Sequence, residues 1–189
     1  MIGGSKEEYR LIKSEQKYAG NVLNLRVDDV RFPNDAIFKR EVIEHEGAVG
    51  VVPLCKDGQV MLVKQYRHPI NDFLLEIPAG LFDEGELPIE CAIRELKEET
   101  GGISNNVMKL AEFYTTPGYS NEKFYLYLAL DVEETEPSRE DDEFIEIKKI
   151  NLDDALDLMV GGKIEDAKTI IGLCLASRYL AEIKNRESK

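Results

Sequence analysis

Residues 80–102 read GLFDEGELPIECAIRELKEETGG, and this stretch decides how the rest of the chain is interpreted. Its apolar side chains recur at helical spacing and form one stripe: Ile89, Ala92, Ile93 and Leu96. Pro88 suits the first turn of a helix, and the glycines that follow Thr100 end it. The pattern predicts a helix from Leu87 to Thr100, and strands surround it on both sides.

Three carboxylates gather on this helix, away from the apolar stripe. Glu95 lies three residues before Glu98 and four before Glu99, so all three share one face. Carboxylate oxygens suit a hard cation such as Mg²⁺ or Mn²⁺, which would attract an anionic substrate and polarise a phosphoryl oxygen. The alternative is a solvated helix face, on which Arg94 and Glu98 form an ordinary ion pair four residues apart.

The spacing of the polar residues resembles the Nudix box, G-x5-E-x7-R-E-U-x-E-E-x-G-U, where U is a bulky apolar residue. Seven polar or glycine positions match: Gly80, Glu86, Arg94, Glu95, Glu98, Glu99 and Gly101. Gly102 departs from the pattern, because an apolar residue is expected there. The resemblance implies an α+β fold, with mixed sheets in an α/β/α sandwich, and hydrolysis of a nucleoside diphosphate linked to another group.

The same resemblance implies roles for residues in and beside the box, with Glu86 as a supporting carboxylate. Glu95 and Glu99 would bind the metal, Glu98 would assist at a second metal, and the carbonyl of Ala79 would complete the site. Arg94 would orient the glutamates, while Gly80 would let the loop backbone approach the metal.

Segments outside the box resemble the ADP-ribose pyrophosphatase branch of the family. They read KQYR at residues 64–67, LEIPAG at 75–80 and FYTTPGYSNE at 113–122, and the resemblance extends over residues 20–180. It implies Mg²⁺-dependent hydrolysis of ADP-ribose to AMP and ribose 5-phosphate. Outside the box, the residues implied for substrate binding are Arg67, Arg40, Pro117 and Gly118, and Glu122 is implied for catalysis. Taken alone, Arg67 is equally a surface ion-pair partner and Glu122 a solvated loop residue.

The general base requires a separate choice. His45 and His68 are the two histidines, and neither lies in a segment that looks catalytic. The resemblance places a carboxylate base on a loop before a late strand, and Glu143 is the first choice, ahead of Asp141 and Glu140.

Composition excludes several classes of function. The 189 residues include 24 lysines and arginines against 37 aspartates and glutamates, so the formal net charge is 24 − 37 = −13. This charge repels nucleic acids and anionic membranes, and no stretch is long and apolar enough to cross a bilayer. Three cysteines without a paired motif favour a reducing compartment, so we expect a cytoplasmic protein.

The remaining elements follow from alternation and turn residues. Strands are predicted at residues 22–27, 38–45, 48–54, 60–66, 74–78, 107–115, 124–130 and 144–150, and further helices at 152–160 and 164–183. Residues 1–46 are predicted to form an N-terminal extension with an antiparallel strand pair, and residues 47–189 the Nudix domain. The extension is expected to contribute substrate contacts and to pair with a second subunit in a homodimer, where Arg40 would reach the partner's pocket.

Two other functions stay open at this point. The enzyme could act on another nucleoside diphosphate sugar or on a dinucleotide, since the pocket side chains cannot be placed from the sequence. A Nudix-fold binding module without catalysis is the third reading, but it predicts broken box carboxylates or an appended DNA-binding segment, and the sequence has neither.

Overall fold

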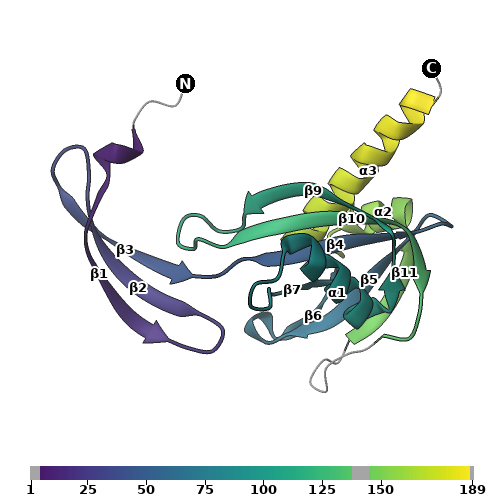
Figure 1. The fold of residues 1–189 in the computed structure, drawn as a ribbon, viewed down its shortest axis with the longest axis horizontal. Coiled ribbons are helices and arrows are strands. Elements are labelled where there is room, and N and C mark those ends of the chain that lie inside the picture. The colour runs from purple at the N-terminus through teal and green to yellow at the C-terminus, as the bar shows by residue number, and fades with distance from the viewer. Residues whose placement is uncertain (1–4, 138–144, 188–189) are drawn as a thin grey trace. The chain divides into compact units, whose positions relative to one another are not determined.

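The computed structural model describes residues 5–137 and 145–187 of the chain (Figure 1). The elements follow in this order: η1 (Lys6–Glu8), β1 (Arg10–Ala19), β2 (Asn24–Arg31), β3 (Ile37–Glu44), β4 (Ala48–Cys55), β5 (Gln59–Arg67), η2 (His68–Ile70), β6 (Asp72–Glu76), β7 (Ala79–Gly80), α1 (Pro88–Thr100), β8 (Gly102–Ile103), β9 (Asn106–Tyr114), β10 (Lys123–Glu134), β11 (Ile145–Asn151), α2 (Leu152–Val160) and α3 (Ala167–Glu187).

The chain packs into two compact units, and the first comprises residues 1–47 and 113–123. Strands β1, β2 and β3 form an antiparallel sheet with β2 in the middle. Asp28 in β2 is only 5% exposed, and it accepts hydrogen bonds from Ser14 Oγ at 2.6 Å and Arg26 Nε at 3.0 Å. These bonds satisfy the one buried carboxylate of this small sheet among the described residues.

The predicted N-terminal strand pair corresponds to β2 and β3, whereas β1 is a strand that was not predicted. Residues 10–19 read RLIKSEQKYA, which lacks the alternation of a half-buried strand. All ten residues of β1 are exposed, so neither face of the strand requires apolar residues at every second position. The division of the chain at residues 46 and 47 stays a prediction.

The second unit comprises residues 48–112 and 124–189 and is built on a mixed sheet. The main strand order is β11-β5-β4-β10-β8, with β6 paired to β5 and β7 paired to β4. Strand β10 runs parallel to β4, whereas β11 and β6 run antiparallel to β5. The predicted hairpin of β4 and β5 is present, and Gly58 in its turn has a φ of 82°.

Alternate residues of β4 contact helices on opposite faces of this sheet. Val49 and Val51 belong to the buried cluster that contains Ala92 of α1. On the other face, a Cβ added to Gly172 of α3 would lie 2.8 Å from Val52 Cγ2. A mixed sheet between helices is the α+β sandwich that the sequence analysis predicted, and this prediction is confirmed.

The apolar stripe of α1 is only half buried. Ala92 is 0% and Leu96 1% exposed, as the helical period predicts, but Ile89 is 39% and Ile93 44% exposed. The expectation of one continuous stripe opposite the carboxylates is therefore wrong for these two isoleucines. The helix is rotated so that Glu95 and Glu99 also lie against the protein, at 7% and 3% exposed.

Within the described ranges, no helix is both long and apolar enough to span a membrane.

Candidate active site

The ends of α1 fix the register of its carboxylates. At the N-terminus, the backbone N–H of Leu87 donates to Glu90 Oε2 at 3.0 Å, and Pro88 opens the first turn. At the C-terminus, Gly101 has a φ of 69°, which glycine adopts at low cost. A Cβ at Gly101 would also lie 2.0 Å from the carbonyl oxygen of Thr135. Gly101 is thus required by both its backbone angle and its surroundings.

Two of the predicted metal ligands lie against strand β7. The Ala79 N–H donates to Glu99 Oε2 at 3.2 Å. A Cβ at Gly80 would lie 1.8 Å from Glu95 Oε1, so any side chain at position 80 would collide with this carboxylate. Strand β7 is held in place because Val49 and Gly50 of β4 pair with it. The structure therefore brings together Ala79, Gly80 and the two buried glutamates.

One guanidinium connects the box carboxylates. Arg94 donates from Nε to Glu86 Oε1 at 2.9 Å, and from Nη1 to Glu95 Oε1 at 2.7 Å and Glu98 Oε2 at 2.9 Å. The hydrogen bonds from Arg94 lower the pKa of Glu86 from 4.5 to about 2. Arg94 thereby holds three carboxylates that would otherwise repel one another, although its role in catalysis stays a prediction.

The residues present fit a hard divalent cation. Glu95 and Glu99 offer carboxylate oxygens in a buried position beside the backbone of Ala79, which is the donor chemistry that Mg²⁺ and Mn²⁺ prefer. Among the residues that the structure describes, no three acidic, histidine or cysteine side chains stand in metal-coordinating geometry. The hydrogen bonds of Arg94 explain why the box carboxylates do not converge on one point, because they draw oxygens of Glu86, Glu95 and Glu98 toward the guanidinium.

Arg67 is a member of a buried ion cluster. Its Nε and Nη2 each donate to Glu76 at 2.7 Å, and the Glu76 side chain is 1% exposed. These hydrogen bonds raise the pKa of Arg67, and the negative charges of Asp166 and Glu99 add to the effect. From its place in the sequence, Arg67 is equally an ion-pair partner or a substrate contact. The ion pair exists, and the substrate contact stays a prediction.

The remaining predicted residues belong to the first unit. The Arg40 guanidinium lies 4.8 Å from the ring centre of Phe32, while Glu122 bonds to Thr115 Oγ1 and lies 3.8 Å from His45. Pro117 and Gly118 lie in a turn closed by the hydrogen bond from the Tyr119 N–H to the Thr116 oxygen at 3.1 Å. Their roles toward substrate stay predictions.

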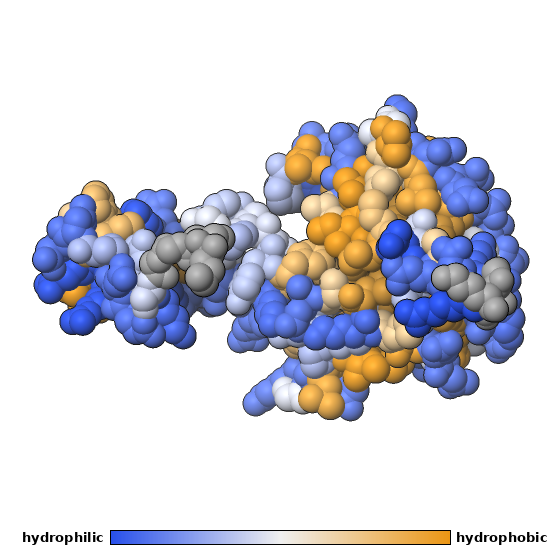
Figure 2. Space-filling model, turned by 90° about the horizontal axis from the view of Figure 1, so that it is seen from above, coloured by the Kyte–Doolittle hydropathy of each residue, from blue (hydrophilic) through white to orange (hydrophobic). Residues whose placement is uncertain are grey.

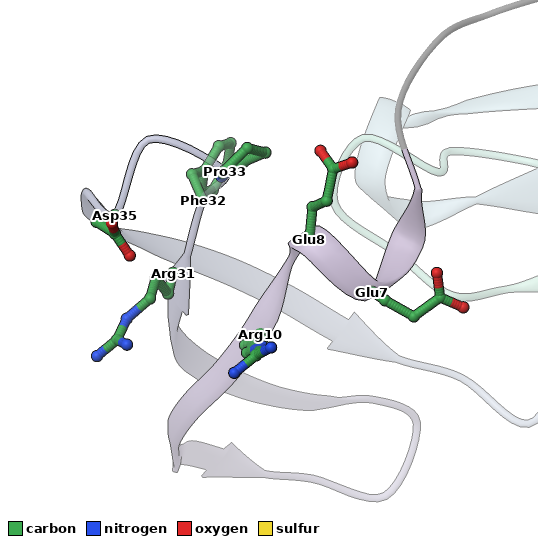
Figure 3. Close-up of a pocket in the computed structure, with 7 residues that line it drawn as sticks. All are labelled: Glu7, Glu8, Arg10, Arg31, Phe32, Pro33 and Asp35. Carbon is green, nitrogen blue, oxygen red and sulfur yellow. The ribbon is translucent and has the colours of Figure 1, made fainter.

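The first unit also contains a pocket of about 490 Å³, lined by Glu7, Glu8, Arg10, Arg31, Phe32, Pro33 and Asp35 (Figure 3). Arg10 and Arg31 face each other there across paired strands. The predicted site residues are not among its lining, so this pocket is not the candidate active site. The predicted base, Glu143, and its alternatives Asp141 and Glu140 lie outside the described residues.

Comparison with known proteins identifies the family. A model of the NUDIX domain matches residues 44–170. The chain is 41% identical over 164 residues to the ADP-ribose pyrophosphatase of Bacillus subtilis, covering 86% of this chain and 89% of that protein. It is 39% identical to the methanol dehydrogenase activator of Bacillus methanolicus, covering 90% and 93%. A GDP-mannose pyrophosphatase of Yersinia pestis is 36% identical, covering 70% and 71%.

A solved structure shares the fold. A crystal structure of an ADP compounds hydrolase superposes with a TM-score of 0.86 and covers 95% of this chain and 98% of that one, at 24% sequence identity. The Nudix-type sandwich predicted from the box is thus confirmed. The chain belongs to the Nudix family and is a hydrolase that acts on pyrophosphate bonds.

Proposed function

We propose that this chain hydrolyses ADP-ribose to AMP and ribose 5-phosphate, with Mg²⁺ bound at the box carboxylates. The observation that carries the proposal is the buried pair of Glu95 and Glu99 against the backbone of Ala79 and Gly80. The choice of substrate is supported by the ADP-ribose pyrophosphatases of Bacillus subtilis and Mycobacterium tuberculosis, which are 41% and 40% identical to the chain.

Glu95, Glu99 and the Ala79 carbonyl would hold the cation, and Glu98 would assist at a second one. When bound, Mg²⁺ polarises a phosphoryl oxygen and lowers the pKa of the attacking water. Arg94 keeps the carboxylates in place through its bonds to Glu95 and Glu98. The water adds across the P–O–P bridge, so that one phosphorus keeps the bridging oxygen and the other gains the hydroxyl.

Arg67 would bind the substrate diphosphate, since a guanidinium matches phosphate oxygens. Arg40, Pro117 and Gly118 are further proposed substrate contacts, and Glu122 is a proposed catalytic carboxylate.

Glu143 is the proposed general base. Replacing it with glutamine removes the proton acceptor but keeps the shape of the side chain, so kcat should fall by about 100-fold or more, with KM little changed. Steady-state kinetics of Glu143→Gln checks this, and Glu146→Gln, on the exposed part of β11, is the control. Unchanged kcat would transfer the role to Asp141 or Glu140.

A homodimer is the proposed assembly. Large apolar side chains of the first unit's sheet are exposed, including Leu11 at 61% and Phe38 at 45%. Leu11 of β1 and Phe38 of β3 both pair with Val30 of the central strand β2. The three side chains therefore form an apolar row across the sheet. The second unit also carries a broad apolar area on the face seen in Figure 2. Such areas favour a covering partner, and a second copy is the simplest one.

The proposed location is the cytoplasm, because Cys55, Cys91 and Cys174 are all free thiols.

A substrate panel in Mg²⁺ tests the proposed reaction. ADP-ribose, GDP-mannose, diadenosine polyphosphates, NADH and ATP are compared by kcat/KM, with release of AMP or phosphate as the readout. ADP-ribose should give the highest value. GDP-mannose in first place would favour the alternative suggested by the Yersinia pestis relative, and ATP in first place would contradict the assignment to diphosphate-linked sugars.

A further inference from the structure

A buried cluster of polar and charged side chains joins the first turn of α3 to the end of β6, and apart from Arg67 none of its members has a role in the proposed reaction. Its members are Glu76, Lys168, Asp166 and Thr169, together with Arg67 of β5. The side chain of Lys168 is only 15% exposed and that of Glu76 only 1%. Burying charged groups costs desolvation free energy. We therefore asked what the geometry of this cluster does.

Lys168 fixes the carboxylate of Glu76. Its Nζ bonds to Glu76 Oε2 and also donates to Asp166 Oδ1 at 3.0 Å. Asp166 is itself held in place, because its Oδ2 accepts from the backbone N–H of Thr169 at 2.9 Å and from the Thr169 hydroxyl at 2.6 Å. Lys168 therefore links Glu76 to the start of a long helix.

Glu76 in turn fixes the guanidinium of Arg67. The two parallel bonds at 2.7 Å use Nε and Nη2 of Arg67, and such a bidentate pair sets the plane of the guanidinium. These bonds do not involve Nη1, and the Arg67 side chain is 39% exposed. The charge of Glu99 also contributes to the raised pKa of Arg67, so this guanidinium lies within electrostatic range of one box carboxylate. Arg67 is thus oriented with one edge available to an anion beside the candidate metal site.

We propose that Lys168 is a positioning residue for Arg67: through Glu76 it holds the Arg67 guanidinium in the orientation that binds the substrate diphosphate. The inference rests on the proposed function, because it needs a diphosphate substrate at this site. Lys168 makes no contact with the reacting atoms in this role. Its effect on substrate passes entirely through Arg67.

A double-mutant cycle tests this. Lys168→Met should raise KM for ADP-ribose about 10-fold and leave kcat within about 2-fold, because the lost contact is made in both ground and transition states. The Kd of the non-hydrolysable α,β-methylene analogue, measured by calorimetry in Mg²⁺, should rise by the same factor. In an Arg67→Ala background, Lys168→Met should change either constant by less than about 2-fold. Lys168→Arg should restore most of the affinity.

Controls separate positioning from stability and charge. Arg178→Met removes a positive charge from the exposed part of the same helix, and it should leave KM unchanged. Melting temperatures are recorded for every variant. If Lys168→Met unfolds below the assay temperature, Asp166→Asn replaces it, since asparagine still caps the helix but no longer offers Lys168 a charge.

The inference fails if Lys168→Met leaves KM and Kd unchanged, or if its effect is the same with and without Arg67. The second result would mean that Lys168 acts on the substrate directly or through the fold. Failure of the proposed function looks different, because the wild type would then not hydrolyse ADP-ribose. In that case the same cycle is measured with the panel nucleotide that the wild type prefers.

Discussion

The missing side chain of Gly80 leaves the space that the Glu95 carboxylate occupies. A Cβ at this position would lie 1.8 Å from Glu95 Oε1 and 2.2 Å from its Cδ, so Gly80→Ala must displace the carboxylate. We expect kcat/KM for ADP-ribose to fall about 100-fold, because a shift of about 1 Å in a positioned group has effects of this size. Thermal melting should change little, since the displaced group is the end of a flexible side chain. Retained activity would mean that the position of Glu95 is not critical.

The residues of the box could be predicted because they are close in sequence. Spacings of three and four place Glu95, Glu98 and Glu99 near one another on any regular helix. Glu76 and Lys168 could not be found in this way, because they are 92 positions apart and meet only after the sheet has formed. The ion pair between Lys168 and Glu76 therefore required the structure, although Glu76 lies in the LEIPAG segment that resembles the branch.

At the scale of elements, α1 and α2 end at glycines of different kinds. Gly101 has a φ of 69°, and a Cβ there would lie 2.0 Å from the carbonyl oxygen of Thr135. Gly161 has a φ of −76°, which every residue adopts, and a Cβ there would lie 3.2 Å from the Asp157 oxygen, a contact that a small shift relieves. Gly101→Ala should lower the free energy of unfolding by more than about 1 kcal/mol. The matched variant Gly161→Ala should change it by less than about 0.5 kcal/mol. Urea denaturation measures both, and equal losses would contradict the need for glycine at Gly101.

Helices and strands could be predicted where one of their faces is buried, because burial imposes a regular spacing of apolar residues in the sequence. Strand β4 (AVGVVPLC) is buried over seven of its eight residues, and its apolar run predicted it with nearly correct bounds. Strand β1 is exposed throughout and was missed. The rotation of α1 was also missed, because Glu95 and Glu99 are buried in place of Ile89 and Ile93, and hydrophobic periodicity cannot foresee a buried polar site.

For the whole molecule, the exposed sheet predicts self-association. Sedimentation at micromolar concentration should give a species of 2 × 21.4 = 42.8 kDa. Leu11→Asp places a charge in the apolar row and should weaken the dimer at least about 10-fold, since a buried leucine contributes about 1.5–3 kcal/mol. Lys13→Gln changes the charge by the same unit on the opposite face of the sheet, where Lys13 pairs with Asp29, and should leave the dimer intact. A wild type that sediments only at 21.4 kDa would exclude the dimer.

The most direct test of the central claim is a Mg²⁺ titration of ADP-ribose hydrolysis by the wild type, Glu99→Gln and Glu90→Gln. Glu99 is buried against the Ala79 N–H, whereas Glu90 bonds to the Leu87 N–H at the far end of the same helix, a bond that glutamine can also accept. We predict that wild type and Glu90→Gln are saturated by Mg²⁺ and silenced by EDTA, and that Glu99→Gln loses about 1,000-fold in kcat at every Mg²⁺ concentration. Hydrolysis that persists in EDTA, or a Glu99→Gln enzyme as active as Glu90→Gln, would contradict it.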